Sequence, residues 1–173
     1  MGKTEETLQL EKSIFRATKK TGVFGCFEVT IGFFGRERVD YMTYDTKGIF
    51  RCYEIKTSVS DFHSKSKKTF CGHYNYYVLT REVYDKVKDE IPKHIGVFVN
   101  GCFHKKPIKQ KLGVSETILK DSMIRSLCRE SDKLFNSSDK KALDKAKKTL
   151  EKEKQEVKKQ RKELANLKKK AGV

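Results

Sequence analysis

The sequence predicts an α/β (α+β) domain with a mixed β-sheet flanked by helices, followed by a long basic helix. In the first third of the chain, runs rich in β-branched and aromatic residues follow one another directly, which is typical of an antiparallel meander. Later strand-like runs alternate with helical ones, which is typical of parallel crossovers. The last fifth of the chain contains no proline and is rich in Lys and Glu, which favours one continuous helix.

The N-terminal part is predicted to contain one helix and three strands. In residues 4–20, apolar side chains recur at roughly helical spacing among charged ones, and Thr21-Gly22 ends the helix. The strands are predicted at 24–34, 37–45 and 49–57, with Gly32 a candidate bulge in the first of them.

The remaining elements alternate, and they divide the chain into three parts. Asn100-Gly101 is a strong hairpin signal between two short strands. The expected parts are a core at 1–110, a packing helix at 111–136 and a basic helical tail at 137–173. The expected elements are a helical segment in the middle of 58–73, strands at 75–80, 94–99 and 102–108, and helices at 81–90 and 115–135.

The charge of the chain predicts a polyanionic partner. The formal net charge is +16, and residues 139–173 hold fourteen Lys or Arg against six Asp or Glu, about half of the total excess. DNA is therefore the expected partner, and an anionic membrane surface is the alternative. No apolar run of spanning length and no signal-peptide core in MGKTEETLQL supports the membrane alternative, so we expect a cytoplasmic protein, in the host cytoplasm if it is phage-encoded. Five scattered cysteines without a CxxC pair fit reduced thiols.

The hairpin between the second and third predicted strands brings acidic residues together. A three-residue loop, Thr46-Lys47-Gly48, makes Asp45 face Ile49, so that Asp40 lies opposite Glu54. Cross-strand neighbours point to the same face of a sheet, with Cβ atoms about 5 Å apart. Lys56 follows Glu54 by two residues and shares that face.

Two carboxylates and an ammonium on one face indicate a catalytic metal site. Such a cluster is electrostatically costly unless a cation joins it, and Mg²⁺ prefers carboxylate and carbonyl oxygens. In phosphodiester hydrolysis the metal polarises the phosphoryl oxygen and lowers the pKa of bound water. Lys56 could position the attacking water or balance the charge at phosphorus.

The segments RVDYMTYD, FRCYEIKTSVSDF and YNYYVL together resemble the core of PD-(D/E)XK nucleases, in particular small DNA-repair proteins of the MmcB type and related phage proteins. The resemblance covers about residues 5–100. It implies a restriction-endonuclease-like α-β-β-β-α-β core and DNA cleavage with Mg²⁺ or Mn²⁺. An endonuclease is favoured over an exonuclease, but the sequence does not decide between them. Repair, recombination or phage DNA processing is the implied setting. Asp40, Glu54 and Lys56 match the motif, the Ile55 carbonyl is an implied metal ligand, and Val39 replaces the motif's proline.

Other residues are candidates for supporting roles. Glu28 on the first strand could be a further metal ligand or simply an exposed carboxylate, and Glu11 on the first helix is a weaker candidate of the same kind. Asp61 is expected to cap the helix that follows it. The expected DNA contacts are made by Lys65, Lys67, Lys68, His73 and the basic tail from Lys140 to Lys170.

Several alternatives remain open at this level. The same hairpin could belong to an inactivated nuclease or to a non-catalytic nucleic-acid-binding accessory protein. Two Cys-x-His pairs, Cys71/His73 and Cys102/His104, suggest zinc, but they are expected at opposite ends of the sheet. In the tail, apolar residues recur every seven positions, and this allows either a single charged helix along DNA or a homodimer. The heptad residues are Leu143, Leu150, Val157 and Leu164, with Ala146, Glu153, Gln160 and Leu167 as companions.

Overall fold

A six-stranded mixed sheet is the centre of the computed structural model, which describes residues 3–35, 37–64, 68–138 and 140–170. The chain divides into two units, Met1–Leu127 and Cys128–Val173, and the sheet lies in the first. Its strand order follows the sequence. The strands are β1 (Val23–Thr30), β2 (Arg38–Asp45), β3 (Phe50–Lys56), β4 (Tyr74–Leu79), β5 (Gly96–Val99) and β6 (Cys102–Lys105).

The strand pairing confirms the predicted mixed sheet. β1, β2 and β3 form an antiparallel meander, β3, β4 and β5 run parallel, and β6 returns antiparallel to β5. The β2–β3 register is the predicted one: Tyr41 pairs with Tyr53, and Asp45 N donates to Ile49 O at 3.1 Å. Asn100 and Gly101 both have positive φ, as a two-residue hairpin turn requires.

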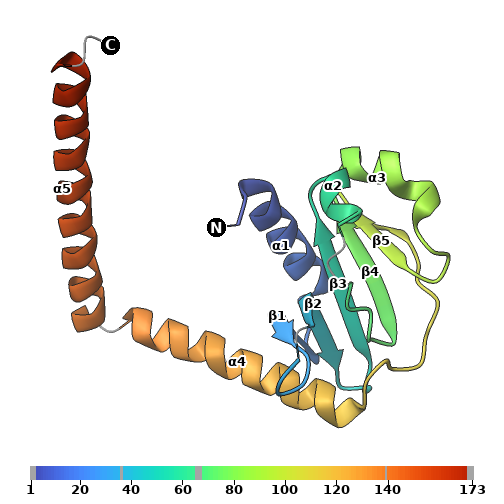
Figure 1. Cartoon of the computed structure of the whole chain (residues 1–173). Coiled ribbons are helices and arrows are strands. Elements are labelled where there is room, and N and C mark those ends of the chain that lie inside the picture. Colours follow the sequence, from blue (N-terminus) through green and yellow to red (C-terminus); the bar gives the residue numbers. More distant parts are fainter. Residues whose placement is uncertain (1–2, 36, 65–67, 139, 171–173) are drawn as a thin grey trace. The chain divides into compact units, whose positions relative to one another are not determined.

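Helices cover both faces of the sheet (Figure 1). On one face α1 packs Ile14 against Tyr41 and Tyr53. On the other face α4 packs Leu119 and Met123 over the β1–β3 part, and α2 and α3 cover the β4–β5 part. The helices are α1 (Glu5–Thr18), α2 (Val59–Phe62), α3 (Arg81–Val87) with the 3₁₀ turn η1 (Lys88–Glu90), α4 (Glu116–Ser138) and α5 (Lys140–Lys170).

Three predicted elements are clearly shorter than expected, and one of them is the strand expected over 102–108, which is β6 and ends at Lys105. The helix expected within 58–73 is α2, which ends at Phe62. The first strand ends at Thr30 and not at residue 34, because a loop begins at Ile31, whose N donates a hydrogen bond to Glu37 O at 3.0 Å. Gly32 therefore lies in this loop, with φ +73°, and not in a strand bulge.

The tail is helical over Lys140–Lys170, in agreement with the sequence. At the heptad positions with described side chains, Leu150 and Val157 are 52% and 46% exposed. The side chains of Leu143, Ala146, Leu164 and Leu167 lie outside the described residues, as do those of Lys140 and Lys170. Within the described ranges no helix is both long and apolar enough to cross a membrane.

Candidate active site

Asp40 lies where strands β2 and β3 separate. The last paired residues are Tyr41 and Tyr53, so the expected Asp40–Glu54 position is the first step beyond the ladder. In a continued ladder Ile55 N would bond to the main chain of Val39, because hydrogen-bonded pairs alternate with non-bonded ones. Instead, Ile55 N donates to Asp40 Oδ2 at 2.8 Å. The carboxylate thus replaces a main-chain acceptor and holds the fork between the strands open.

Glu54 lies next to this fork, near the C-terminal end of β3, and is 3% exposed. Its Oε1 accepts a hydrogen bond from Thr69 N at 3.3 Å, from the segment that leads into β4. Over the described residues no hydrogen bond reaches Oδ1 of Asp40 or Oε2 of Glu54. Each carboxylate is therefore fixed by one main-chain N–H through one oxygen, while its second oxygen is available to a ligand.

Lys56 completes the predicted cluster. Its side chain is 9% exposed, and its Nζ lies 3.3 Å from Asp61 Oδ1. Asp61 was expected to cap α2, and that prediction is wrong. Ser58 is the N-cap, because the helix begins one turn earlier and Ser58 Oγ accepts from Asp61 N at 3.0 Å. The Asp61 side chain is thereby left to pair with Lys56.

Glu28 lies on β1 opposite Asp40 of β2, but its side chain is bound to cations. Glu28 contacts Lys3 Nζ at 2.9 Å and Arg38 Nε at 2.8 Å, and Lys3 also pairs with Glu11. The backbone of Glu28 is left-handed, with φ +56°. This kink breaks the strand alternation, since Cys26 and Val29 lie in the same core cluster although they are three residues apart. Glu28 and Glu11 therefore stand at the edge of the site in ion pairs with Lys3.

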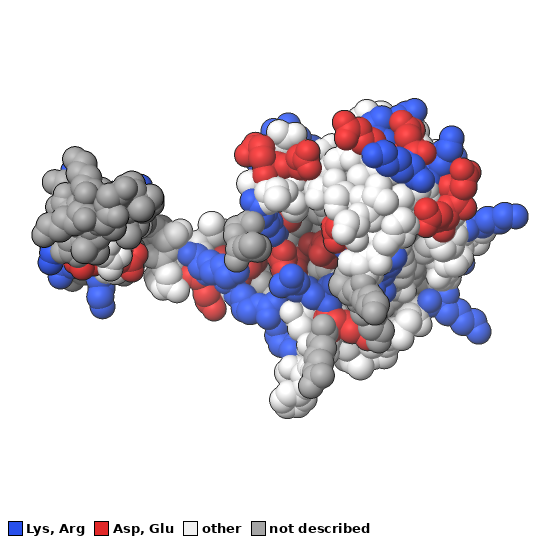
Figure 2. Space-filling view, turned by 45° about the horizontal axis from the view of Figure 1, so that its top comes forward, with Lys and Arg blue, Asp and Glu red and all other residues white. Residues whose placement is uncertain are grey.

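Burial raises the pKa of both central carboxyl groups. Desolvation raises the pKa of Glu54 to about 8, with the Asp40 charge as the next cause. Desolvation also raises the pKa of Asp40, against the hydrogen bond from Ile55 and the charge of Lys56. The charges present thus leave the two carboxylates incompletely compensated. Figure 2 shows acidic side chains recessed in a hollow of the molecule, with basic side chains beside them.

The raised pKa of Glu54 makes the stability of the metal-free protein depend on pH. An unfolded Glu titrates near its ordinary value of 4.5, while folded Glu54 keeps its proton to about 8. The folded state therefore binds more protons between these values, and the free energy of unfolding should fall as the pH rises from 4.5 to 8. We expect a loss on the order of a few kcal/mol. Urea unfolding in EDTA across this range should show it, and Glu54→Gln should flatten it. An equal slope in Glu54→Gln and the unsubstituted protein would contradict the assignment.

The donor set fits a hard divalent cation. Mg²⁺ is typically held by one or two carboxylates, with water and substrate phosphate as the remaining ligands. Asp40 and Glu54 each offer one oxygen, and the Ile55 carbonyl points towards the fork because the N–H and C=O of one strand residue face the same neighbour. In the described part of the chain, no group of three or more His, Cys, Asp or Glu side chains is arranged to hold a metal. The cluster thus supplies two carboxylates and one carbonyl.

Of the predicted DNA contacts, the structure brings one lysine to this side of the sheet. Lys68 immediately precedes Thr69, and its Nζ lies 4.7 Å from the ring centroid of Phe62 on α2. Lys65 and Lys67 lie outside the described residues. His73 lies beside Phe50, whose N donates to its Nδ1 at 3.1 Å, at the opposite end of β3 from Lys56. At about 3.3 Å per residue, that end is roughly 20 Å away, and we leave His73 out of the site.

The residues considered for zinc are dispersed. The Cys71 Sγ contacts the Cys52 Sγ at 3.7 Å in the core. Cys102 and His104 lie on β6, where His104 packs against Tyr84 of α3. His73 is occupied by Phe50 N. These positions do not form a common site.

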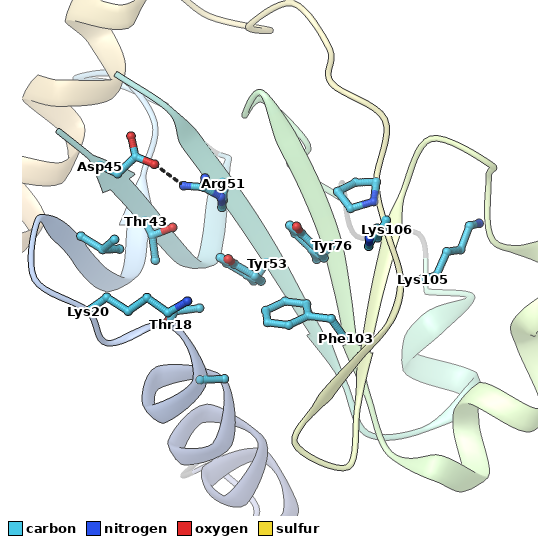
Figure 3. A pocket seen from close by; sticks show the side chains of 13 residues that line it. Thr18, Lys20, Thr43, Asp45, Arg51, Tyr53, Tyr76, Phe103, Lys105 and Lys106 are labelled. Carbon is cyan, nitrogen blue, oxygen red and sulfur yellow. Dashed lines mark hydrogen bonds and ion pairs between the residues drawn. The ribbon is translucent and has the colours of Figure 1, made fainter. Parts of the chain in front are cut away.

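A cavity of about 370 Å³ lies on the α1 face of the sheet, apart from the carboxylates (Figure 3). Tyr53 and Tyr76 stack along it with ring centroids 5.0 Å apart, next to Phe103. Asp45 and Arg51 form an ion pair of 2.7 Å at one end. Successive strand residues point to opposite faces, so Tyr53 faces this cavity while Glu54 faces the fork. The cavity is therefore separated from the candidate active site by the sheet.

Three sets of contacts at or beside the site were missed from the sequence alone. Thr69 holds Glu54 through its main-chain N–H, which carries no sequence signal. Asp61 pairs with Lys56. The sequence feature that could have predicted this pair is the opposite charge of Asp61, five residues after Lys56 and in the next helix. Lys3, which joins Glu11 to Glu28, precedes the first helix and had no spacing that could predict its role.

Comparison with known proteins supports the fold. The solved structure of a protein of unknown function from Silicibacter pomeroyi is similar, with a TM-score of 0.57 and 15% sequence identity. The match covers 79% of this chain and 92% of that chain. No protein-family model and no curated protein matches the sequence. The chain is thus an α+β protein with a six-stranded mixed sheet between helices, and its fold is similar to that of the bacterial protein.

Proposed function

We propose that this chain is a divalent-metal-dependent DNA nuclease of the PD-(D/E)XK type that hydrolyses phosphodiester bonds. The fork carries the proposal: Asp40 and Glu54 are each held by a main-chain N–H, and Lys56 extends from the same strand face. Buried carboxylates with raised pKa values are typical of functional sites. DNA repair, recombination or phage DNA processing is the proposed setting.

The roles of the residues follow from their chemistry. Asp40, Glu54 and the Ile55 carbonyl would hold Mg²⁺ or Mn²⁺, which polarises a phosphoryl oxygen and lowers the pKa of a bound water. Lys56, on the same strand face as Glu54, orients the attacking water or offsets the charge that develops at phosphorus. Asp61 fixes the Lys56 ammonium from the start of α2. Thr69 fixes the rotamer of Glu54.

Cleavage of a defined set of DNAs tests the proposal. Labelled linear duplex, single-stranded, flap and four-way-junction DNA and closed circular plasmid are incubated with Mg²⁺, Mn²⁺ or EDTA. We expect metal-dependent cleavage that EDTA abolishes. We also expect nicking of the closed circle, because an endonuclease needs no DNA end. The absence of cleavage of every DNA with either metal would overturn the proposal.

The alternative is a nucleic-acid-binding accessory protein with a nuclease-like fold. One observation favours it: among the described residues, the site gathers two carboxylates and no larger group of metal-ligating side chains. The basic tail would support binding without any chemistry. DNA binding that is unaffected by EDTA, with no product in the cleavage assay, would identify this function.

The basic tail is expected to supply DNA affinity and not catalysis. Each phosphate that it neutralises releases counterions, so that log affinity falls with log salt by about 0.9 per contact on duplex DNA. Deletion of residues 139–173 removes a net charge of about +8. We therefore expect weaker binding at low salt and a salt slope that is flatter by several units, with turnover at saturating DNA nearly unchanged. Salt-titrated binding curves measure both quantities.

A homodimer through the tail gives a different result. If Leu150 and Val157 belong to a dimer seam, deletion should convert a protein that cuts both strands into a nicking monomer. The salt slope should then change little. Sedimentation of the full-length and truncated proteins, run beside the binding curves, distinguishes the two. An unchanged slope together with loss of a dimer would contradict the DNA-affinity role.

A further inference from the structure

The loop between β1 and β2 presents two phenylalanines to solvent. Phe34 is 100% exposed and Phe33 is 74% exposed. Leaving such a side chain in water forgoes the stabilisation that its burial would give, and adjacent exposed apolar side chains of this size commonly mark an interaction site.

The loop is built to hold this conformation. Its ends are joined by the hydrogen bond from Ile31 N to Glu37 O, and Gly32 N donates to Ser122 Oγ of α4 at 3.0 Å. Gly32 has φ +73°, and a Cβ on Gly35 would lie 1.6 Å from the Ile31 carbonyl oxygen. The two phenylalanines are thus bracketed by two glycines that the turn requires.

An arginine lies against the loop, and the loop adjoins the candidate active site. The Arg125 guanidinium lies 4.1 Å from the centroid of the Phe33 ring. Arg38 follows the loop and pairs with Glu28. Asp40 is three residues beyond Glu37, where the loop ends, a distance of roughly 10 Å along the strand, so the loop lies at the same end of β2 as the candidate active site. Exposed aromatic rings with an arginine beside them fit nucleobases attached to phosphates.

We propose that Phe33 and Phe34 stack on unpaired nucleobases close to the scissile phosphate. This inference rests on the proposed nuclease function, and it names the substrate class as DNA with single-stranded or readily unstacked bases, such as a flap or a junction between single and double strands. Apolar side chains that insert at base steps, and aromatic side chains on which single-stranded bases stack, are common means of recognition. Phe34 makes the larger contribution because its ring is fully exposed, whereas Phe33 is already covered on one side by Arg125.

Because the sequence contains no tryptophan, a tryptophan introduced into the loop is a specific fluorescent probe. Phe34→Trp gives a protein with a single indole at the loop tip. In EDTA, which prevents cleavage, flap or single-stranded DNA should quench its fluorescence by stacking, and blunt duplex should do so much less. Vesicles of anionic phospholipid should leave the emission unchanged. A blue shift with vesicles and no quenching by DNA would assign the loop to a membrane and overturn the proposal.

Binding and cleavage by alanine variants complete the test. Phe34→Ala should weaken flap binding in EDTA about tenfold, in the range expected for loss of base stacking, with the unfolding midpoint unchanged. The control is Phe24→Ala, which removes another exposed ring, 53% exposed, on β1. Equal losses in the two variants, or no loss in Phe34→Ala, would overturn the proposal. Indole quenching by DNA without cleavage under any metal would support the stacking site while refuting the nuclease.

Discussion

Asp40→Asn and Glu54→Gln are each expected to lower DNA cleavage by more than about 100-fold. Changes to groups that merely support a metal ligand already cost 10- to 100-fold, so the loss of a direct ligand should cost more. Both substitutions keep the hydrogen bonds of the fork, because the amide oxygens can still accept from Ile55 N and Thr69 N. The measurement is single-turnover cleavage of flap DNA in Mg²⁺.

DNA binding separates this effect from a folding defect. Asp40→Asn removes a carboxylate that would face phosphate, so its affinity for DNA in EDTA should stay the same or increase. Without metal, Glu54 keeps its proton up to a pH of about 8, so Glu54→Gln changes no charge at neutral pH and its affinity in EDTA should stay the same. Asp85→Asn is the matched control, because Asp85 is an exposed carboxylate paired with Arg81 on α3. Cleavage that persists undiminished in both Asp40→Asn and Glu54→Gln would refute the metal assignment.

Lys56→Met is expected to lower the turnover number by about 10²–10³-fold, the size of effect seen when one group that stabilises developing charge is removed. Methionine keeps the buried stem of the side chain but removes the ammonium. The binding of Mg²⁺ or Mn²⁺ should be retained, since the carboxylates remain and a nearby positive charge is lost. Single-turnover kinetics and calorimetry with Mn²⁺ measure the two properties separately.

Asp61→Asn is the control for the ion pair. It breaks the same contact with Lys56 but leaves the ammonium in place, and the Asp61 side chain is 42% exposed, so its loss should cost less than about tenfold. If Lys56→Met abolished metal binding while Glu54→Gln preserved it, the roles of the two residues would be reversed.

The hairpin that carries the site could be predicted because its signals are local. A three-residue loop ending in glycine sets the register of both strands, and Gly48 has the positive φ that such a loop needs. Once the register was known, alternation placed Glu54 and Lys56 on one face. The placement of Asp40 opposite Glu54 followed from the same count.

Other features depended on contacts that are distant in sequence. Strand β1 was extended too far, because FGCFEVTIGFF is rich in β-forming residues throughout, while the turn is fixed by Ser122 on α4. The kink at Glu28 accompanies ion pairs with Lys3 and Arg38 that strand propensity does not reveal. His73 was predicted to contact DNA, but it lies at the far end of β3 from Lys56. Its distance from the fork depends on the β3–β4 register, in which Arg51 pairs with Tyr74, and this register cannot be read from the local sequence.

The hydrogen bond from Ile55 N to Asp40 has an evolutionary consequence. One carboxylate oxygen maintains the separation of β2 and β3, and the other is available for chemistry. A descendant that lost catalysis would be free to vary Lys56, whose ammonium contacts only the half-exposed Asp61 among the described residues. Position 40 would remain under selection for a short side chain that accepts a hydrogen bond. Relatives that lack the proposed activity should therefore carry Asn more often than Ala at this position, because the structural role of the side chain does not depend on catalysis.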